Sequence, residues 1–390
     1  MDTNKEREIT VAILSVSLLT VMAGAIVAPA MSSLSHFFSE QSASVIKLIV
    51  TLPALLVIPT AMITGRLADR FGRRNLLLIG LVLYLAGGLG GAFAGDFYTL
   101  LGFRAILGLS VGLVMPISTG LVSEFFHGDK ARQMMGWVSA ANHFGGMAAQ
   151  IISGTLAVMS WRYSFGVYGI ALISLIVVAF WLPEPTSQAQ EGRATPLPLK
   201  TYCTAAFMPL LMVIFYTVPL NISLFVEGTG MGNSTTSGVA CALVTGAPFL
   251  VGIFFRSITT HLGKSAVFVA ICTMGLGMFT IGEANNLTTM FTGAFLVGTG
   301  EGYLFPYVMN AVRATVAPRD GVRALAVMSS MLYFGQFISP ITIDALGGLF
   351  STSTSSQPFM IAGALCMIGA TVSLGFTIQQ RLKRKCEKAA

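Results

Sequence analysis

Long apolar stretches recur along the whole chain, separated by short segments that hold nearly all of the charged residues. Each stretch has about 17 to 29 residues, enough to cross a bilayer core of about 30 Å as an α-helix. Well inside the stretches, only Arg104 and Glu301 interrupt the apolar pattern with a charge. The pattern predicts an all-α membrane protein with twelve spans, at residues 9–31, 48–64, 75–95, 96–123, 133–161, 163–183, 201–226, 236–255, 265–282, 284–312, 324–343 and 358–380.

The second half of the chain repeats the pattern of the first half at a constant offset of 190 residues. The matches include glycines and prolines, whose backbone roles few other residues can fill. They pair Pro29 with Pro219, Gly87 with Gly277, Gly108 with Gly298, Gly112 with Gly302, Pro116 with Pro306 and Gly145 with Gly335. The repeat predicts two parallel six-helix halves, residues 1–183 and 201–390, with a central cavity between them. The polar, Pro-rich segment 184–200 would be a cytoplasmic linker.

Composition and charge support a membrane location. Hydrophobic residues make up 54% of the chain and charged residues only 10%, a balance that a soluble domain could not bury. The net charge of +7 comes mainly from Lys and Arg in loops on one predicted side, with Lys47 and Arg162 as exceptions. By the positive-inside rule, we expect both termini in the cytoplasm. We also expect a multi-pass protein of the plasma membrane, in this case the bacterial inner membrane. The charge therefore indicates topology and no nucleic-acid partner.

Neither the cysteines nor any nucleotide-binding pattern indicates a cofactor. The five cysteines are scattered without a C-x-x-C pair, which argues against a disulfide framework and a metal site. The chain has no G-x-x-x-x-G-K-[ST] motif. We therefore expect no cofactor, no enzymatic activity and an energy source in an ion gradient.

The loop after the second predicted span reads GRLADRFGRR at residues 65–74. This decapeptide closely resembles the loop signature of the major facilitator superfamily, and it follows the second span as it does in that family. Gly65 and Gly72 would permit a tight reversal of the chain. The alternative is that the loop is only a positive-inside turn.

The resemblance implies a cytoplasmic gate built on this loop. Asp69 would accept hydrogen bonds from the start of the eleventh span near Ala324, where a helix N-terminus favours an anion. Arg70 or Arg73 would pair with Glu124, at the end of the fourth span.

The fourth span carries Arg104-x-x-x-Gly108-x-x-x-Gly112, which resembles the superfamily's second motif. In that motif an intramembrane arginine is coupled to proton movement. A charge at membrane depth usually faces a cavity or a partner. The alternative is that Arg104 reaches back to the outer interface.

Glu301, in the tenth span, is the only acidic residue well inside any predicted span. The repeat maps it onto Val111, which lies two helical turns from Arg104 and so on the same helix face. If Arg104 faces the central cavity, Glu301 does too, and its carboxylate could bind a proton or a cationic substrate in alternation. The alternative is a static buried carboxyl group. His143 is the reserve proton carrier.

Two further patterns resemble the drug:proton antiporter branch of the superfamily. The first span contains GAIVAPA at 24–30, without the usual second proline, and the fifth-span signature is degraded, with Gln150 and Ser153 at two of its positions. Asn142 and His143 are adjacent, so at most one of them is expected to meet substrate. The candidate cavity residues are Met22, Met115, Asn142, Gln150, Tyr216, Asn221, Tyr303, Phe305 and Tyr307.

The sequence therefore predicts a monomeric secondary transporter that works by alternating access. The favoured function is the export of small lipophilic or cationic molecules in exchange for protons, with membrane lipid as its surroundings. The degraded fifth-span signature leaves open a uniporter or symporter that imports a metabolite. A non-transporting receptor or sensor is the alternative from another class.

Overall fold

The computed structural model describes residues 3–184, 196–317, 320–349 and 354–389. Within these residues every regular element is an α-helix or a 3₁₀ helix. Most of the predicted linker, 184–200, lies outside the described residues, so its extent stays a prediction.

The first half of the chain forms helices that correspond to the first six predicted spans. Their bounds are α1 Thr3–Ala25, η1 Ala28–Ala30, α2 Met31–Phe37, α3 Ala43–Ile46, α4 Leu48–Phe71, α5 Arg73–Gly90, η2 Gly91–Phe93, α6 Phe97–Phe125, α7 Gly128–Ala157, α8 Trp161–Ser164, η3 Phe165–Ile170 and α9 Ala171–Trp181. The first span is therefore longer than 9–31, and it is broken between α1 and η1.

The second half continues the series. Its bounds are α10 Leu199–Ala205, α11 Phe207–Gly228, α12 Ser234–Leu262, η4 Gly263–Ser265, α13 Ala266–Gly282, α14 Leu287–Arg313, α15 Gly321–Gly347 and α16 Gln357–Ala389. Helix α11 runs through Pro219 without a break, whereas the first span is interrupted just before the equivalent Pro29.

Nine helices of the described chain are long and apolar enough to cross a membrane, and α13 is a shorter apolar helix. Helices α7 and α14 are not among the nine. Both are rich in glycine and in polar side chains such as Asn142 and Asn310, which lowers their mean hydropathy. The protein is therefore a multi-pass membrane protein, and the number of twelve spans stays a prediction.

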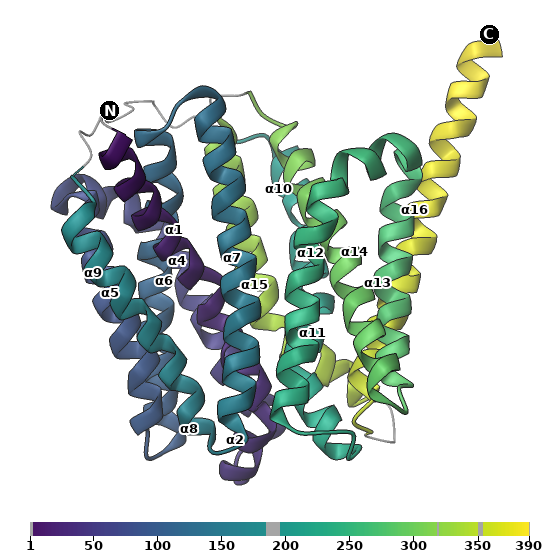
Figure 1. The fold of residues 1–390 in the computed structure, drawn as a ribbon. Helices are drawn as coiled ribbons and strands as arrows, with labels where there is room; N and C mark the ends of the chain where they lie inside the picture. Colours follow the sequence, from purple (N-terminus) through teal and green to yellow (C-terminus); the bar gives the residue numbers. More distant parts are fainter. Residues whose placement is uncertain (1–2, 185–195, 318–319, 350–353, 390) are drawn as a thin grey trace.

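Two hydrophobic clusters divide the buried side chains. One cluster is built almost wholly from residues between Ile9 and Leu182, and the other almost wholly from residues between Ala205 and Cys366. Figure 1 shows α1–α9 on one side and most of α10–α16 on the other, with α1 beginning and α16 ending at the same end of the bundle. We call this the terminal end. Helices α7 and α12, and α4 and α15, pack across the boundary between the two groups.

The sequence repeat is also present in the helix packing. A Cβ atom on Gly87 would lie 2.5 Å from the Leu107 nitrogen, and one on Gly277 would lie 2.7 Å from the Val297 nitrogen, 190 residues later. Both glycines thus allow helix backbones to touch, in α5 against α6 and in α13 against α14.

The N-caps of α6 and α14 are repeated as well. Asp96 accepts a hydrogen bond from the Thr99 nitrogen, and Asn286 accepts one from the Thr289 nitrogen, each at 2.9 Å. The side-chain hydrogen bond from Thr99 holds the pKa of the Asp96 carboxyl group below its usual range. Because an N-cap fixes where a helix starts, α6 and α14 begin at equivalent positions.

Helices α7 and α12 join the two halves through a glycine crossing. A Cβ atom on Gly154 would lie 2.6 Å from the Ser234 carbonyl oxygen, and one on Gly238 would lie 2.5 Å from the Gln150 carbonyl oxygen. The two backbones are therefore in direct contact at this point.

Candidate functional site

The loop 65–74 turns at Gly72, whose φ of 81° is in the region that favours glycine. Arg73, the first residue of α5, forms an ion pair with Glu124 near the end of α6. Of the two pairings that the resemblance implied, the structure thus contains the one with Arg73. Arg70 is exposed, and its guanidinium lies over the Phe71 ring.

Glu184 is a residue of this loop region that the sequence reasoning missed. Its carboxylate accepts hydrogen bonds from the Arg73 nitrogen at 2.6 Å and the Arg74 nitrogen at 3.2 Å. It therefore supplies the negative charge that a helix N-terminus favours, in this case at the start of α5. A proline-flanked acidic residue at the end of the sixth span was the available signal.

Asp69 does not make the contact that the family resemblance implied. Its side chain is exposed, and no hydrogen bond or ion pair joins it to another described residue. Ala324 is fully buried within the hydrophobic cluster of the second half. A latch between two halves holds only in the state in which that end is closed, so this contact is not expected in a state where it is open.

Arg104 is completely buried inside the first half. Its Nε donates to the Ile49 carbonyl oxygen at 2.6 Å, its Nη1 to the Tyr168 hydroxyl at 2.6 Å and its Nη2 to the Ala23 carbonyl oxygen at 3.2 Å. The alternative of a side chain reaching for the membrane interface is therefore wrong, and so is the premise that Arg104 faces an open cavity. Its acceptors are neutral oxygen atoms of α4, η3 and α1.

Glu301 is 9% exposed on α14. The neighbouring glycines bring the α14 backbone close to two other helices, because Cβ atoms would lie 2.6 Å from the Ala270 oxygen at Gly300 and 2.5 Å from the Pro248 Cα at Gly302. Among the described residues, none donates a hydrogen bond to the Glu301 carboxylate. A buried carboxylate without a donor is costly in its charged form, so this group is suited to taking up a proton or a cation.

Two tyrosines of the second half reach the first half. Tyr216 packs against the hydrophobic cluster of the first half, and its hydroxyl lies 3.6 Å from where a Cβ on Gly24 would stand. The Tyr333 hydroxyl donates to the Met115 sulfur at 2.8 Å. Tyr333 was not among the residues expected from the sequence, since a single tyrosine in an apolar span carries no local signal.

Asn142 and His143 point to different helices. Asn142 accepts a hydrogen bond from the Thr20 hydroxyl at 2.7 Å, within the first half. The His143 Nδ1 lies 3.0 Å from the Thr245 carbonyl oxygen of α12, across the boundary between the halves.

The other candidate cavity residues are only partly brought together. Tyr303 stacks between Phe255 and Tyr307, at 5.0 and 6.2 Å between ring centroids, in an aromatic group of its own. Asn221 donates to the Thr217 carbonyl oxygen within α11. Met22 and Gln150 are buried, and Phe305 is half-buried. The predicted central cavity stays a prediction.

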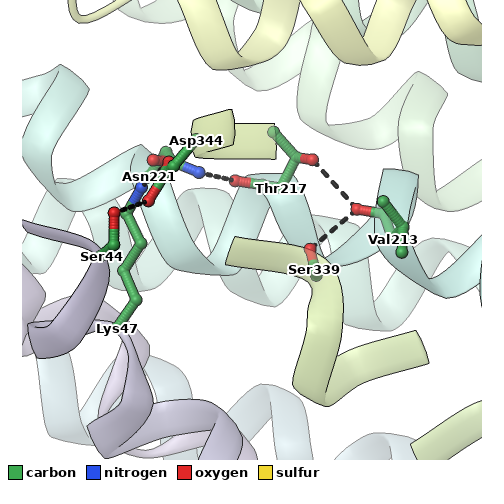
Figure 2. A network of polar contacts seen from close by, with 7 residues as sticks. All are labelled: Ser44, Lys47, Val213, Thr217, Asn221, Ser339 and Asp344. Atoms are coloured by element: carbon green, nitrogen blue, oxygen red, sulfur yellow. Dashed lines mark hydrogen bonds and ion pairs between the residues drawn. The ribbon is translucent and has the colours of Figure 1, made fainter. Parts of the chain in front are cut away.

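The end opposite the termini carries polar contacts between the two halves. Lys47 Nζ and Ser44 Oγ both bind the Asp344 carboxylate at 2.6 Å (Figure 2). The Lys47 side chain is only 5% exposed. The Ser32 hydroxyl donates to Glu227 at 2.6 Å, also across the boundary. The sequence marked Lys47 only as an exception to the charge bias.

Comparison with known proteins gives one consistent result. The model of the Major Facilitator Superfamily matches residues 13–281. The quinolone resistance protein NorA of Staphylococcus aureus is 25% identical, with 82% of this chain and 84% of that protein covered. The 3-(3-hydroxy-phenyl)propionate transporter of Escherichia coli K12 is also 25% identical, with 80% and 81% covered. The crystal structure of a D-xylose-proton symporter is 17% identical, with a TM-score of 0.77 and 94% and 96% of the chains covered.

Proposed function

Because the chain belongs to the Major Facilitator Superfamily and is a transporter rather than an enzyme, we propose that it exports small lipophilic or cationic compounds in exchange for protons. The observation that carries the proposal is Glu301, a carboxylate buried in α14 without a donor among the described residues. A group of this kind can hold either a proton or a cation, and this competition is what an exchange of the two requires.

The surroundings of Glu301 fit a cationic, partly apolar ligand. Tyr216 and Tyr333 of the second half both pack against the hydrophobic cluster of the first half. Aromatic faces attract cations that have shed part of their water. Met115 adds an adaptable apolar surface from the first half. The similarity to a quinolone resistance protein supports a drug-like substrate.

We further propose that the chain crosses the membrane twelve times and that the terminal end is cytoplasmic, as the positive-inside rule indicates. Residues 1–183 and 201–390 would act as two rigid halves joined by 184–200, and the two hydrophobic clusters support this division. The transporter would function as a monomer in the bacterial inner membrane, because all elements of the proposed site lie in one chain.

The contacts between the halves support an inward-facing state. Lys47–Asp344 and Ser32–Glu227 join the halves at the end opposite the termini, whereas Asp69 at the terminal end is exposed. In the outward-facing state Asp69 would bind the start of α15, while Gly65, Arg70 and Gly72 shape the loop. The Arg73–Glu124 pair lies within the first half and can persist in both states.

The remaining proton-coupling candidates take secondary roles in this proposal. Arg104 contributes a fixed positive charge that is fully buried in the first half. His143 is tied to the Thr245 carbonyl oxygen across the α7–α12 boundary, where its protonation would act on the contact between the halves. It remains the reserve carrier if Glu301 is dispensable.

An importer driven by a gradient is the second candidate. One observation favours it: the fifth-span signature of antiporters is degraded at Gln150, a buried residue whose Oε1 has no partner among the described residues. A polar atom at this position suits a hydroxylated metabolite better than a lipophilic cation. The direction of transport separates the two candidates.

The test uses purified protein in liposomes with an imposed pH gradient and tetraphenylphosphonium as the lipophilic cation. We expect the wild type to move the cation against the direction of proton flow. Glu301→Gln, whose neutral amide can hold neither the proton nor the cation, should abolish this movement. Glu40→Gln, at an exposed acidic position, is the matched control. Full gradient-driven transport by Glu301→Gln would refute the coupling role, and movement of the cation together with protons would favour the importer.

A further inference from the structure

Arg104 binds a carbonyl oxygen that a proline leaves without its usual donor. Pro53 lies inside α4 and has no N–H group, so the Ile49 carbonyl oxygen, four residues earlier, lacks its helical hydrogen bond. The Nε atom of Arg104 lies 2.6 Å from this oxygen. Arg104 is fully buried, and an unpaired carbonyl at such a site would be costly.

The same guanidinium binds a second carbonyl oxygen at the break in the first span. Helix α1 ends at Ala25, and the turn that follows contains the backbone bonds Ile26 N to Met22 O and Ala30 N to Val27 O. Neither bond reaches the Ala23 oxygen. That oxygen instead accepts from the Tyr168 hydroxyl at 2.8 Å and from Arg104 Nη2 at 3.2 Å.

The second half provides an internal comparison. At the positions equivalent to Arg104, Pro53 and Ala23 it has Ala294, Leu243 and Val213. Helix α11 is continuous there, and the Val213 carbonyl oxygen accepts a hydrogen bond from the Ser339 hydroxyl at 2.8 Å (Figure 2). The arginine is thus present in the half that has Pro53 and the break. In the other half α12 also contains a proline, Pro248, but α11 is unbroken and the hydroxyl groups of Thr217 and Ser339 bind the Val213 oxygen.

We propose that Arg104 is a positioning residue. Its guanidinium joins the end of α1, at the Ala23 oxygen, to the turn of α4 that precedes Pro53, at the Ile49 oxygen, and we call this link the clasp. The planar fork of Arg104 offers several donors and stays charged at every relevant pH, so one side chain can serve two carbonyl oxygens of different helices. The clasp fixes the place of η1 and α2 relative to α4.

The clasped segment makes the contacts that close the end opposite the termini. The Ser223 hydroxyl of α11 donates to the Pro29 carbonyl oxygen at 2.9 Å and accepts from the Ser32 nitrogen at 3.2 Å. Ser32 also binds Glu227. Arg104, although buried in the first half, therefore controls how firmly this end closes.

The first experiment is a double-mutant cycle of Arg104→Lys with Pro53→Ala, read by thermal melting in detergent. A lysine ammonium cannot span both carbonyl oxygens, so we expect Arg104→Lys alone to lower the melting temperature by several degrees. The Pro53→Ala change restores an N–H donor to the Ile49 oxygen. Arg104→Lys should therefore lower the melting temperature clearly less in the Pro53→Ala background than in the wild type.

Pro59→Ala is the matched control for this cycle. It restores a donor in the same helix at a carbonyl oxygen that Arg104 does not touch. The drop in melting temperature caused by Arg104→Lys should therefore be the same in this background as in the wild type. Equal losses from Arg104→Lys in the wild-type and Pro53→Ala backgrounds would overturn the assignment of the Ile49 oxygen.

A second measurement separates positioning from stability alone. Leu34 in α2 is fully buried at the closed end, so a cysteine placed there should react slowly with a membrane-impermeant maleimide. We expect Arg104→Lys to raise the labelling rate several-fold, and an unchanged rate with a lowered melting temperature would overturn the positioning role. If Arg104→Lys does not fold, Tyr168→Phe takes its place, because it removes the other donor to the Ala23 oxygen. We expect Tyr168→Phe to raise the labelling rate at position 34, and Pro53→Ala should not lower that rate again.

Discussion

Polar side chains inside the spans differ mainly in whether a partner is available to them. Arg104 has three neutral oxygen acceptors, whereas Glu301 has no donor among the described residues. A polar group with all its hydrogen-bond partners makes its surroundings rigid, whereas a group without a hydrogen-bond partner is free to bind a ligand. The two charges within the spans are therefore suited to different tasks, although the sequence pattern treated them as a pair.

Glu184 provides a prediction at the scale of a single residue. Glu184→Ala removes the acceptor for the Arg73 and Arg74 nitrogens, so the start of α5 loses a favourable charge, a loss of about 0.3–1 kcal/mol. We expect a small drop in melting temperature together with a slower transport rate, because the loop 65–74 loses its anchor. Glu40→Ala, at an exposed acidic position, is the control, and an identical response of both variants would contradict this role.

The acceptors of Arg104 show why the site was only partly predictable. The sequence indicated that a buried arginine needs partners. Because every residue has a backbone carbonyl oxygen, the sequence does not show which of them the arginine binds. Pro53 was the one available sign, because a proline inside a helix frees the carbonyl oxygen four residues earlier. Tyr168 and Tyr333 gave no comparable signal.

At the scale of helices, the repeat that predicted the two halves also extends to their helix contacts. The glycines matched at an offset of 190 residues allow equivalent backbone contacts in both halves, as Gly87 and Gly277 do. These contacts were predictable because a missing Cβ is a property of the residue itself. The break in the first span was not, because Pro29 and Pro219 are both present and only one of their helices is interrupted.

Gly87→Ala tests this packing. The added Cβ would lie 2.5 Å from the Leu107 nitrogen of α6, so α5 and α6 must move apart, at a cost of about 1–3 kcal/mol. We expect less folded protein and a lower melting temperature, and Gly277→Ala should behave alike. Gly102→Ala is the control, because a Cβ there meets nothing within 4 Å. An unchanged melting temperature of Gly87→Ala would show that α5 and α6 can move apart at little cost, contrary to this expectation.

At the scale of the whole molecule, the two halves are joined by contacts between residues about 300 positions apart. Lys47 and Asp344 come from opposite halves, and nothing near either residue in the sequence marks it as half of a pair. Family resemblance indicated a gate at the terminal end, where the structure leaves Asp69 exposed. The opposite gate had to be read from the structure.

The Lys47–Asp344 pair carries a prediction about the balance of states. Asp344→Asn leaves the ammonium group of Lys47, whose side chain is 5% exposed, without its counter-charge, which is strongly unfavourable in the closed form. We expect a larger fraction of molecules open at this end, measured as a longer distance between spin labels on α3 and α16. Glu6→Gln, which breaks the exposed pair with Lys130 within the first half, should leave this distance unchanged.

The reversed pair, Lys47→Asp with Asp344→Lys, gives the complementary outcome. If the ion pair itself holds the halves together, the exchange of charges should restore part of the closed population. A distance that stays long in the double variant would assign the effect to local packing instead of the charge pair.

The burial of Lys47 also sets a limit on the speed of inhibition. Under the proposed alternating access, a compound that enters from the closed end would reach Glu301 only after Lys47 and Asp344 have separated. At high concentration, its association rate should therefore level off at the frequency with which this pair breaks. A binding time course of the unlabelled protein would then measure the rate at which the closed end opens spontaneously.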